Sequence, residues 1–439
     1  MSRGRLGFTT RASSLLAAGI TAVVCGLLLG ETDLVRAGVL VAAVPIAAAV
    51  VVHRSRVRVA NRRAVEPLRA QAGQSVTAHL TITNRSLLPT GALMLEDQLP
   101  DRFVGRARFV LDSLGSHEAR TVSYRMPNLG RGRYRAGPLR IRLSDPFHMI
   151  DLTRSFTATT EFLVTPVIDL LPAGEPPRTD DVGDGAGSHS IGTHGADDAS
   201  TREYRIGDDL RKIHWRSSAR TGALMVRQEE RPWRAQTTVL LDLRASAHTV
   251  ADDDAIGMGR DPRQTSSLEW AVSAVASVGS QALHAGRDVG IIGDPERPER
   301  MRFTDNGHLV TYLACVRETH GTDLTPLTAA IRASARDSSL VAVLGRLDPP
   351  AVRLLADAHP RGRSSPALAL LLDVDSWTSG GSRTASRHGA QDVDATAAVL
   401  RNSGWRVTIV RCGTDTPEAW RVLLSGLPPT AARNPVLRR

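Results

Sequence analysis

Two apolar runs near the amino terminus place the strongest constraint on how this chain can fold. The first covers residues 12–30 and the second residues 34–52, with Glu31 and Asp33 in the short turn between them. About 19 apolar residues are enough for one helix to cross the hydrocarbon core of a bilayer. The two runs therefore predict a two-helix membrane anchor within residues 1–63.

A signal peptide is the alternative interpretation of the first run, because three arginines precede it. Two features argue against it: no small-residue cleavage site follows, and a second apolar run begins almost at once. Arginines flank the hairpin on both sides, and positively charged flanks tend to stay in the cytoplasm. We therefore expect a two-pass protein of the cell membrane with both termini in the cytoplasm.

The net charge supports this topology more than it supports a nucleic-acid partner. The chain of 439 residues carries a formal charge of +10. Residues 1–63 hold nine arginines against two acids, so this segment accounts for +7 of the total. Only +3 remains for the rest of the chain. The basicity is mainly a topology signal, and we expect the bilayer, and no nucleic acid, to be a partner.

Two residue counts exclude several chemistries. The chain has a single lysine, Lys212, which Ile213 follows and no glycine run precedes, so it cannot form a phosphate-binding Walker loop. Schiff-base catalysis would have to use that same lysine. The three cysteines lie far apart, so they have neither zinc-ligand spacing nor the pattern of a disulfide framework. If ATP takes part in the work of this protein, a partner must hydrolyse it.

Residues 64–171 alternate apolar and polar side chains with a period of two. The clearest runs cover residues 76–82, 122–126 and 139–143, and turn residues separate them. This pattern predicts an antiparallel β-sandwich of the immunoglobulin-like kind. The next segment, residues 172–200, is rich in Pro, Gly, Asp, Ser and Thr, which predicts a flexible loop.

Residues 237–430 show a different rhythm, in which apolar strands alternate with helices; residues 431–439 form a tail. Strands after Thr237 and near residues 340, 367 and 407 predict a doubly wound, parallel α/β sheet. Ligands of such sheets bind at the carboxyl ends of the strands. The overall class is therefore α+β multidomain.

The segment of residues 201–236 is a dense mixture of arginines and acids with few apolar anchors. A turn at Gly207 allows Asp208 to cap a following helix. Spacings of three and four predict that one face of this helix carries Arg211, His214 and Ser218.

Three interpretations of this segment remain open. Asp208 and His214 form an acid–base pair, or the arginines and Trp215 hold an anionic ligand or a nucleic acid. In the third, the segment is a buried ion-pair network that joins two domains. The positions that form this partner-binding or structural signature are Arg202, Tyr204, Gly207, Asp208, Arg211, His214, Trp215, Ser218 and Arg220.

The spacing of these residues, with Ile213 and Ala219, resembles the signature of domain-of-unknown-function family 58. Residues 145–147, 165–166 and 404–407 extend the resemblance along the chain. It implies a membrane-anchored bacterial protein whose carboxyl-terminal domain is similar to von Willebrand factor A domains. It also implies two partners, a MoxR-type AAA+ ATPase and a transglutaminase-like membrane protein.

The resemblance further implies a site for Mg²⁺, which prefers hard oxygen ligands. The ligands implied here are Asp242, Ser246 and Thr322. Arg244 stands where these domains have their first serine, and a guanidinium there can neutralise Asp242 in place of the cation. We therefore expect no cofactor, with a degenerate Mg²⁺ site as the alternative.

Together these features favour a non-enzymatic, membrane-tethered adaptor that acts with the AAA+ ATPase in the assembly or maturation of other proteins. The alternative is a hydrolase-like enzyme that uses Asp208 and His214.

Overall fold

A computed structural model describes most of the chain, in two compact units. The first unit contains residues 1–167 with two short later segments, and the second contains most of the remainder. The described residues are 5–54, 59–87, 89–100, 106–144, 150–172, 201–204, 213–227, 236–249, 261–334, 338–359, 367–378 and 393–426. Nearly all of the predicted loop at residues 172–200 and the predicted tail at residues 431–439 lie outside these ranges.

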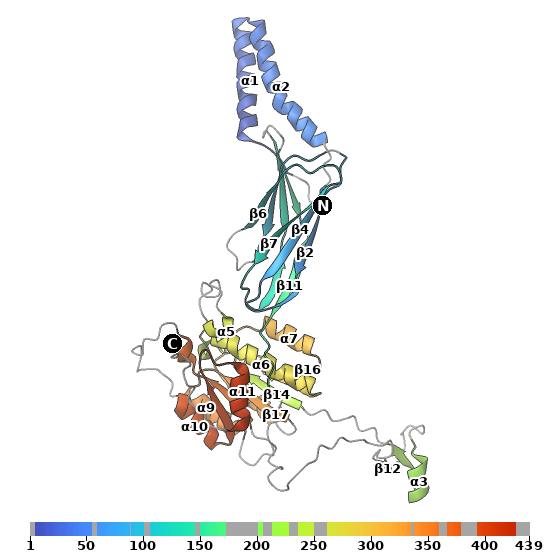
Figure 1. Cartoon of the computed structure of the whole chain (residues 1–439), viewed down its shortest axis with the longest axis vertical. Helices are drawn as coiled ribbons and strands as arrows, with labels where there is room; N and C mark the ends of the chain where they lie inside the picture. The colour runs from blue at the N-terminus through green and yellow to red at the C-terminus, as the bar shows by residue number, and fades with distance from the viewer. Residues whose placement is uncertain are drawn as a thin grey trace, which may run out of the picture. The chain divides into compact units, whose positions relative to one another are not determined.

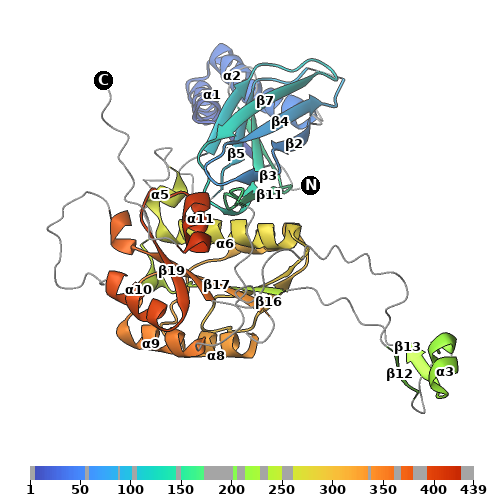
Figure 2. The same cartoon turned by 60° about the horizontal axis from the view of Figure 1, so that its bottom comes forward.

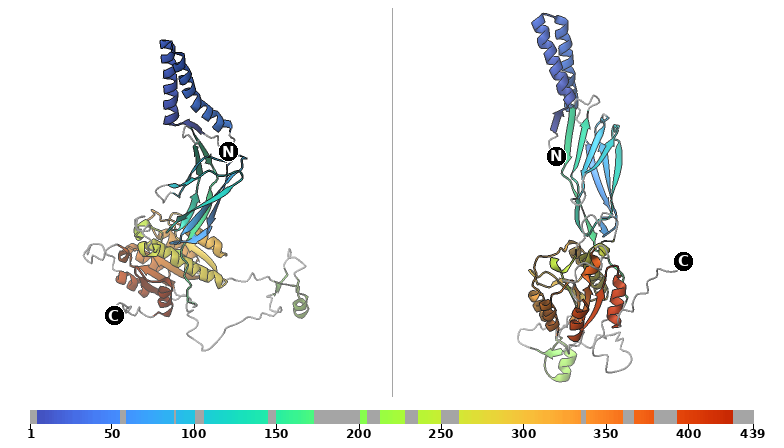
Figure 3. Two further views of the ribbon diagram at one scale, coloured as in Figure 1. Left: turned by 45° about the horizontal axis from the view of Figure 1, so that its top comes forward. Right: turned by 90° about the vertical axis from the view of Figure 1, so that its left-hand side faces the viewer.

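The two apolar runs form two helices, as predicted. Helix α1 (Thr10–Leu29) and helix α2 (Thr32–Arg54) pack side by side (Figures 1 and 3). The side chain of Thr9 caps α1, and Gly30 ends it in the left-handed conformation. Both helices are long and apolar enough to cross a membrane.

Glycines at the contact between α1 and α2 let the two backbones approach closely. A Cβ atom on Gly38 of α2 would lie 2.7 Å from the backbone nitrogen of Val23 in α1. A Cβ atom on Gly19 of α1 would meet the backbone nitrogen of Ala42 at the same distance. Small residues at such contacts are the usual basis of close helix packing in membranes.

Substitution of Gly38 by leucine should therefore force the hairpin apart. The measurement is the rate at which cysteines placed at Ala12 and Ala48, which pack together, form a disulfide. We expect this rate to fall several-fold in the Gly38→Leu chain. Ala43, on the exposed side of α2, provides the control: Ala43→Leu adds the same bulk and should leave the rate unchanged. Equal rates in all three chains would show that the glycine contact does not hold the helices together.

Eleven strands in the described part of the first unit form three sheets. One has the order β1-β10-β9-β5-β6, a second β2-β4-β7 and a third β3-β11-β8. Their pairing is antiparallel except between β3 and β11, so the antiparallel prediction fails at that one pair. The strands are β1 (Arg5–Phe8), β2 (Val59–Glu66), β3 (Arg69–Gln71), β4 (Val76–Asn84), β5 (Leu93–Gln98), β6 (Arg106–Leu111), β7 (Ala119–Met126), β8 (Gly132–Ala136), β9 (Leu139–Ser144), β10 (Ile150–Phe156) and β11 (Thr160–Thr165).

A charged cluster is buried within this β unit. The Asp97 carboxylate accepts hydrogen bonds from the Arg63 guanidinium and, at 2.6 Å, from the hydroxyl of Tyr124. The Asp97 side chain is fully buried and that of Arg63 is 3% exposed. Burial and the bond to Asp97 raise the pKa of Tyr124 far above its usual range. Arg63 also donates to the carbonyl of Ala158, so the cluster joins four segments: β2, β5, β7 and the connection between β10 and β11.

The second unit contains a six-stranded sheet in the order β16-β15-β14-β17-β18-β19. Every pairing is parallel except that of the edge strand β16, which agrees with the predicted parallel sheet. The strands are β14 (Gln236–Leu241), β15 (Asp288–Ile292), β16 (Met301–Phe303), β17 (Ser338–Leu344), β18 (Ala367–Leu372) and β19 (Trp405–Val410).

Helices cover both faces of this sheet (Figure 2). Helices α8, α9 and α10 pack on one face, and α6 and α11 lie on the other. The strands carry buried aliphatic side chains on both faces, which explains their continuous apolar runs. The helices are α5 (Pro262–Thr265), α6 (Ser267–His284), α7 (Asn306–Cys315), α8 (Thr325–Ser334), α9 (Pro349–Ala358), α10 (Val393–Asn402) and α11 (Thr416–Ser425).

The described part of the signature segment forms a small structure of its own. Strand β12 (Thr201–Glu203) pairs antiparallel with β13 (Met225–Arg227), and helix α3 (Trp215–Thr221) lies between them in sequence. Ile213 forms a β-bridge with Val226, so α3 starts only at Trp215. The predicted helix therefore does not run through Ile213 and His214, and Arg211 itself lies outside the described residues.

Candidate functional site

The carboxyl ends of the parallel strands carry the densest set of charged side chains in the second unit. Asp242 follows β14 directly, Arg346 follows β17 and Asp373 follows β18. Because the strands are parallel, these ends meet at one edge of the sheet. This edge is where sheets of this kind bind their ligands.

Asp242 and Arg244 form a buried, two-pronged ion pair at the centre of this edge. The guanidinium Nε of Arg244 lies 2.9 Å from one carboxylate oxygen of Asp242, and a terminal nitrogen lies 2.8 Å from the other. The backbone nitrogen of Arg244 donates to the same carboxylate at 3.2 Å. The exposed fraction of the side chain is 5% for Arg244 and zero for Asp242. The guanidinium thus occupies both oxygens of the strand-end acid.

The surroundings keep the Arg244 guanidinium charged. Burial disfavours its charge, but hydrogen bonds from it to Asp242 and the attraction of that carboxylate outweigh burial and raise the pKa of Arg244. The charge of Asp348 acts in the same direction. A terminal nitrogen of Arg244 also donates to the carbonyl of Arg346 at 3.1 Å. The loop after β14 is therefore linked to the loop after β17.

His248 supports the pair from behind. Its Nε2 lies 2.7 Å from the backbone carbonyl of Asp242, which can only accept, so Nε2 carries the proton. Its Nδ1 lies 3.2 Å from the hydroxyl of Ser267, at the start of α6. Burial lowers the pKa of His248 below its usual range. The ring is therefore neutral at pH 7 and holds the strand end against α6.

This lowered pKa predicts how the stability of the α/β unit depends on pH. In the unfolded chain His248 takes up a proton near pH 6.5, whereas in the folded chain it does so only at lower pH. Stability is therefore present above pH 6.5 and is lost as the pH falls below it, by up to about 1.4 kcal/mol per pH unit. His248→Gln should flatten this slope between pH 6.5 and 5.

The measurement is urea unfolding followed by tryptophan fluorescence. All six tryptophans lie beyond residue 200, so the signal reports on the second unit. His284, the last residue of α6, provides the control. The substitution His284→Gln should keep the wild-type dependence of stability on pH. A slope that His248→Gln does not change would contradict the role given to this ring.

Two further ion pairs lie along the same edge. Arg346 pairs with Asp375, and both side chains are about two-fifths exposed. Arg411, which follows β19, donates to Asp373 at 3.2 Å. A glycine allows the loops to meet, because a Cβ atom on Gly345 would lie 2.1 Å from the carbonyl oxygen of Ala247. The edge thus presents three arginine–aspartate pairs on closely packed loops.

The implied metal ligands are placed as follows. Asp242 is held by Arg244, whereas Ser246 and Thr322 are exposed. Among the described residues, no hydrogen bond joins these three side chains, and no group of three or more His, Cys, Asp or Glu is arranged to hold a metal ion. Both carboxylate oxygens of Asp242 bind the guanidinium of Arg244, which stands where the resemblance places a cation.

The signature residues fall into two groups. Gly207, Asp208 and Arg211 lie outside the described residues, and of Arg202 only the backbone in β12 is described. Tyr204 is half-buried, and its backbone nitrogen donates to the carbonyl of Leu224 at 2.8 Å.

The remaining signature residues build or flank α3. Nδ1 of His214 accepts a hydrogen bond from the backbone nitrogen of Ser217, so His214 is the N-cap of the helix. The hydroxyl of Ser218 donates to the carbonyl of His214 and accepts from the backbone nitrogen of Met225. Trp215 is 68% exposed, and Arg220 is exposed as well. His214 and Ser218 thus have structural roles, while Trp215 faces solvent.

Sequence reasoning missed several residues of the sheet edge. His248, Arg346, Asp373, Asp375 and Arg411 were not among the predicted site residues. A usable signal was present, since four of them lie within five residues of the end of an apolar strand. Their pairing depends on which strands are neighbours, and that information comes only from the fold.

The chain therefore combines two apolar helices, a β-sheet unit and a mostly parallel α/β unit with a charged carboxyl edge. Residues 200–356 match the family described as "Protein of unknown function DUF58". This stretch of the chain thus carries the family's pattern, as the signature predicted.

Comparison with known proteins gives one distant relative and several weak structural similarities. The chain is 24% identical over 234 residues to "Uncharacterized protein YeaD" of Bacillus subtilis (strain 168), covering 52% of this chain and 54% of that protein. It thus spans about half the length of this relative. Among solved structures, the CARDB domain of a Pyrococcus furiosus protein is 10% identical with a TM-score of 0.18, covering 25% of this chain and 88% of that one. The β-glucosidase of Listeria innocua is 14% identical with a TM-score of 0.16, covering 25% and 16%. These scores are too low to assign a fold.

Proposed function

We propose that this protein is a membrane-tethered cytoplasmic adaptor whose α/β unit binds a protein partner at the carboxyl edge of its sheet. The partner is a MoxR-type AAA+ ATPase, and the pair acts in the assembly or maturation of other proteins, together with a transglutaminase-like membrane protein. In this proposal the α/β unit has a von Willebrand factor A-like fold and the β unit an immunoglobulin-like one.

The observation that carries the proposal is the set of arginine–aspartate pairs at this edge. Asp242, the acid most suited to hold a cation or act as a base, already holds the Arg244 guanidinium. The more exposed pairs, Arg346 with Asp375 and Arg411 with Asp373, offer alternating charges to a docking surface. Charges arranged in this way favour recognition of one partner over others and speed its association.

The tether rests on α1 and α2. Their length and apolar composition are sufficient for two membrane passes, and arginine-rich flanks on both sides favour a cytoplasmic location for the rest of the chain. Extraction of membranes with alkaline carbonate tests this part: the chain should stay in the pellet. Release into the supernatant would refute the tether.

Recovery of the full chain from detergent-solubilised membranes tests the partner. An affinity tag on the carboxyl terminus should retain the MoxR-type AAA+ ATPase several-fold above an untagged control, with ATP present or absent. Failure to retain the ATPase both with and without ATP would contradict the adaptor function.

An enzyme that uses Asp208 and His214 is the second candidate, because acid, base and arginine residues are close together in the sequence of the signature segment. Nδ1 of His214 caps α3, which occupies one of the two nitrogens that a general base would use. His214→Asn preserves a capping side chain and removes the base. If this variant loses function in vivo while α3 stays folded, the enzyme hypothesis gains over the adaptor.

A further inference from the structure

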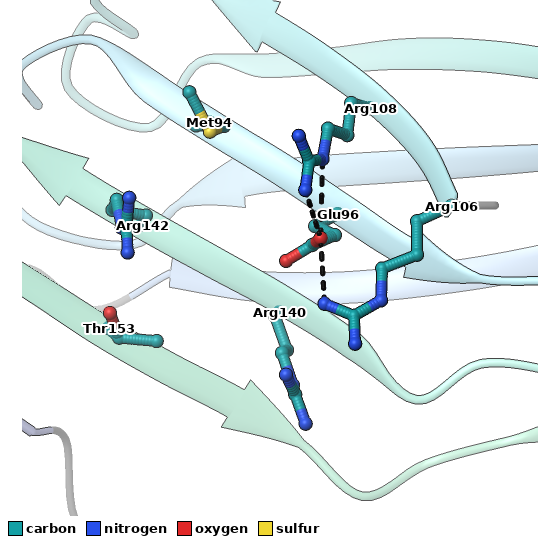
Figure 4. A pocket seen from close by; sticks show the side chains of 7 residues that line it. All are labelled: Met94, Glu96, Arg106, Arg108, Arg140, Arg142 and Thr153. Atoms are coloured by element: carbon teal, nitrogen blue, oxygen red, sulfur yellow. Dashed lines mark hydrogen bonds and ion pairs between the residues drawn. The ribbon is translucent and has the colours of Figure 1, made fainter.

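The outer face of the five-stranded sheet is a second charged surface, separate from the carboxyl edge of the α/β unit. A cavity of about 400 Å³ lies on it, and four guanidinium groups surround that cavity (Figure 4). The residues that line it are Met94, Glu96, Arg106, Arg108, Arg140, Arg142 and Thr153.

The alternation of strands β5 and β9 puts these side chains on the solvent side. Leu139 and Ile141 of β9 are fully buried, so Arg140 and Arg142 point to the opposite face. The β-sheet register places Arg140 beside Glu96 of β5 and Arg142 beside Met94. The arginines are therefore held on a rigid sheet at spacings set by strand pairing.

Of the four arginines that line the cavity, two pair with its single described carboxylate. Arg106 and Arg108 both donate to the same oxygen of Glu96, at 2.9 Å and 3.1 Å. Hydrogen bonds from Arg106 are the main reason why the pKa of Glu96 is lowered. Arg140 and Arg142 are exposed, and within the part of the chain that the structure describes neither contacts a carboxylate. Among the described residues that line the cavity, one carboxylate thus stands against four guanidinium groups, and the cavity is complementary to an anion.

This face also offers apolar surface and lies near α1 in the chain. Met94 is 40% exposed, and its strand partner Val110 is 69% exposed. The edge strand β1 pairs with β10, and the single residue Thr9 separates β1 from α1. Arg5 of β1 is in register with Thr153, which is in register with Arg142. Arg142 therefore lies three residues along the strands and two strands across from Phe8, which places it about 14 Å from the end of β1.

We propose that this basic face binds the phosphate groups of anionic phospholipids in the leaflet that holds α1 and α2. The proposal rests on the tether proposed above. Arg142 lies between one and two Debye lengths from the end of β1, so the surface potential of an anionic leaflet is weakened there but still attracts its charge. The guanidinium group of arginine is well suited to bind two oxygens of one phosphate at once. The exposed apolar side chains of Met94 and Val110 can contact the adjoining acyl chain. Binding orients the β unit at the bilayer surface.

The test uses the full chain in detergent, freed of lipid and titrated with phosphatidylglycerol or phosphatidylcholine, with bound lipid counted by native mass spectrometry. The wild-type chain should bind phosphatidylglycerol several-fold more tightly than phosphatidylcholine. Arg140→Gln with Arg142→Gln should weaken phosphatidylglycerol binding about tenfold or more. Arg62→Gln with Arg125→Gln is the matched control, because both arginines are exposed on the sheet β2-β4-β7, and it should bind as the wild type does.

Four outcomes would overturn the proposal. The first is equal binding of the two lipids, and the second is an unchanged affinity in the Arg140/Arg142 variant. The third is preferential binding of a glutamate-rich peptide, which would assign the face to an acidic protein; full competition by inorganic phosphate alone would likewise refute lipid as the ligand. Carbonate extraction tests the tether independently, so a chain that stays in the membrane but shows no lipid preference refutes this inference alone.

Discussion

Replacement of Arg244 by serine is expected to lower the free energy of unfolding of the α/β unit by about 3–5 kcal/mol. The substitution removes one partner of a buried ion pair and leaves the Asp242 carboxylate, which is fully buried, without its counter-charge. Urea unfolding of the full chain, followed by tryptophan fluorescence, measures the change. It should be the largest effect of any single substitution at this edge.

Arg346→Ser is the matched control. This substitution breaks the half-exposed pair with Asp375, so it should cost less than about 1 kcal/mol. Added Mg²⁺ distinguishes the two views of the site: it should not stabilise the wild-type chain, because Arg244 holds both oxygens of Asp242. Two results would contradict the role given to Arg244. One is stabilisation of the wild type by Mg²⁺, and the other is a decrease in the free energy of unfolding of Arg244→Ser that is as small as that of Arg346→Ser.

Replacement of Asp97 by asparagine should destabilise the β unit by a similar amount, about 3–5 kcal/mol. Asparagine preserves the shape of the side chain but leaves the buried Arg63 guanidinium unneutralised. Hydrogen exchange of the full chain measures the effect, as a loss of protection in β4 and β5 while protection in the six-stranded sheet is kept.

The neighbouring acid provides an internal control for this prediction. Glu96 lies on the same strand, on the opposite face, and its pairs with Arg106 and Arg108 are more exposed. Glu96→Gln should therefore leave the protection of β4 and β5 nearly unchanged. Equal losses in Asp97→Asn and Glu96→Gln would show that burial of the ion pair is not what matters.

Periodicity predicted most of the fold. The alternation of strands and helices expected over residues 237–430 is present, and α6 and α10 are among its helices. Strands β14, β17, β18 and β19 were each evident as apolar runs. Strand β1 escaped because its four residues are too few to show a period. Helix α9 was also missed, although its buried residues Val352 and Leu355 lie on one helical face. The parallel pairing of β3 with β11 also escaped, because it joins strands about 90 residues apart.

The site was predictable only where its residues are close in sequence. Asp242 and Arg244 are two positions apart, and their pairing was among the alternatives considered. Arg346 and Asp375, or Asp373 and Arg411, meet because their strands are neighbours in the sheet, which composition and spacing do not reveal. The helix proposed through Arg211 and Ser218 failed for a local reason: a β-bridge at Ile213 competes with helix formation, and His214 takes over the cap.

The most direct test of the adaptor proposal is a reversal of charge at the carboxyl edge, read by co-purification of the AAA+ ATPase. Arg346→Asp with Asp375→Arg keeps an ion pair at this position but exchanges its charges toward a partner. We predict that the double variant folds with wild-type stability, stays in the membrane fraction and retains at least about tenfold less ATPase than the wild type. Retention of the ATPase at the wild-type level would contradict the assignment of this edge as the partner-binding surface.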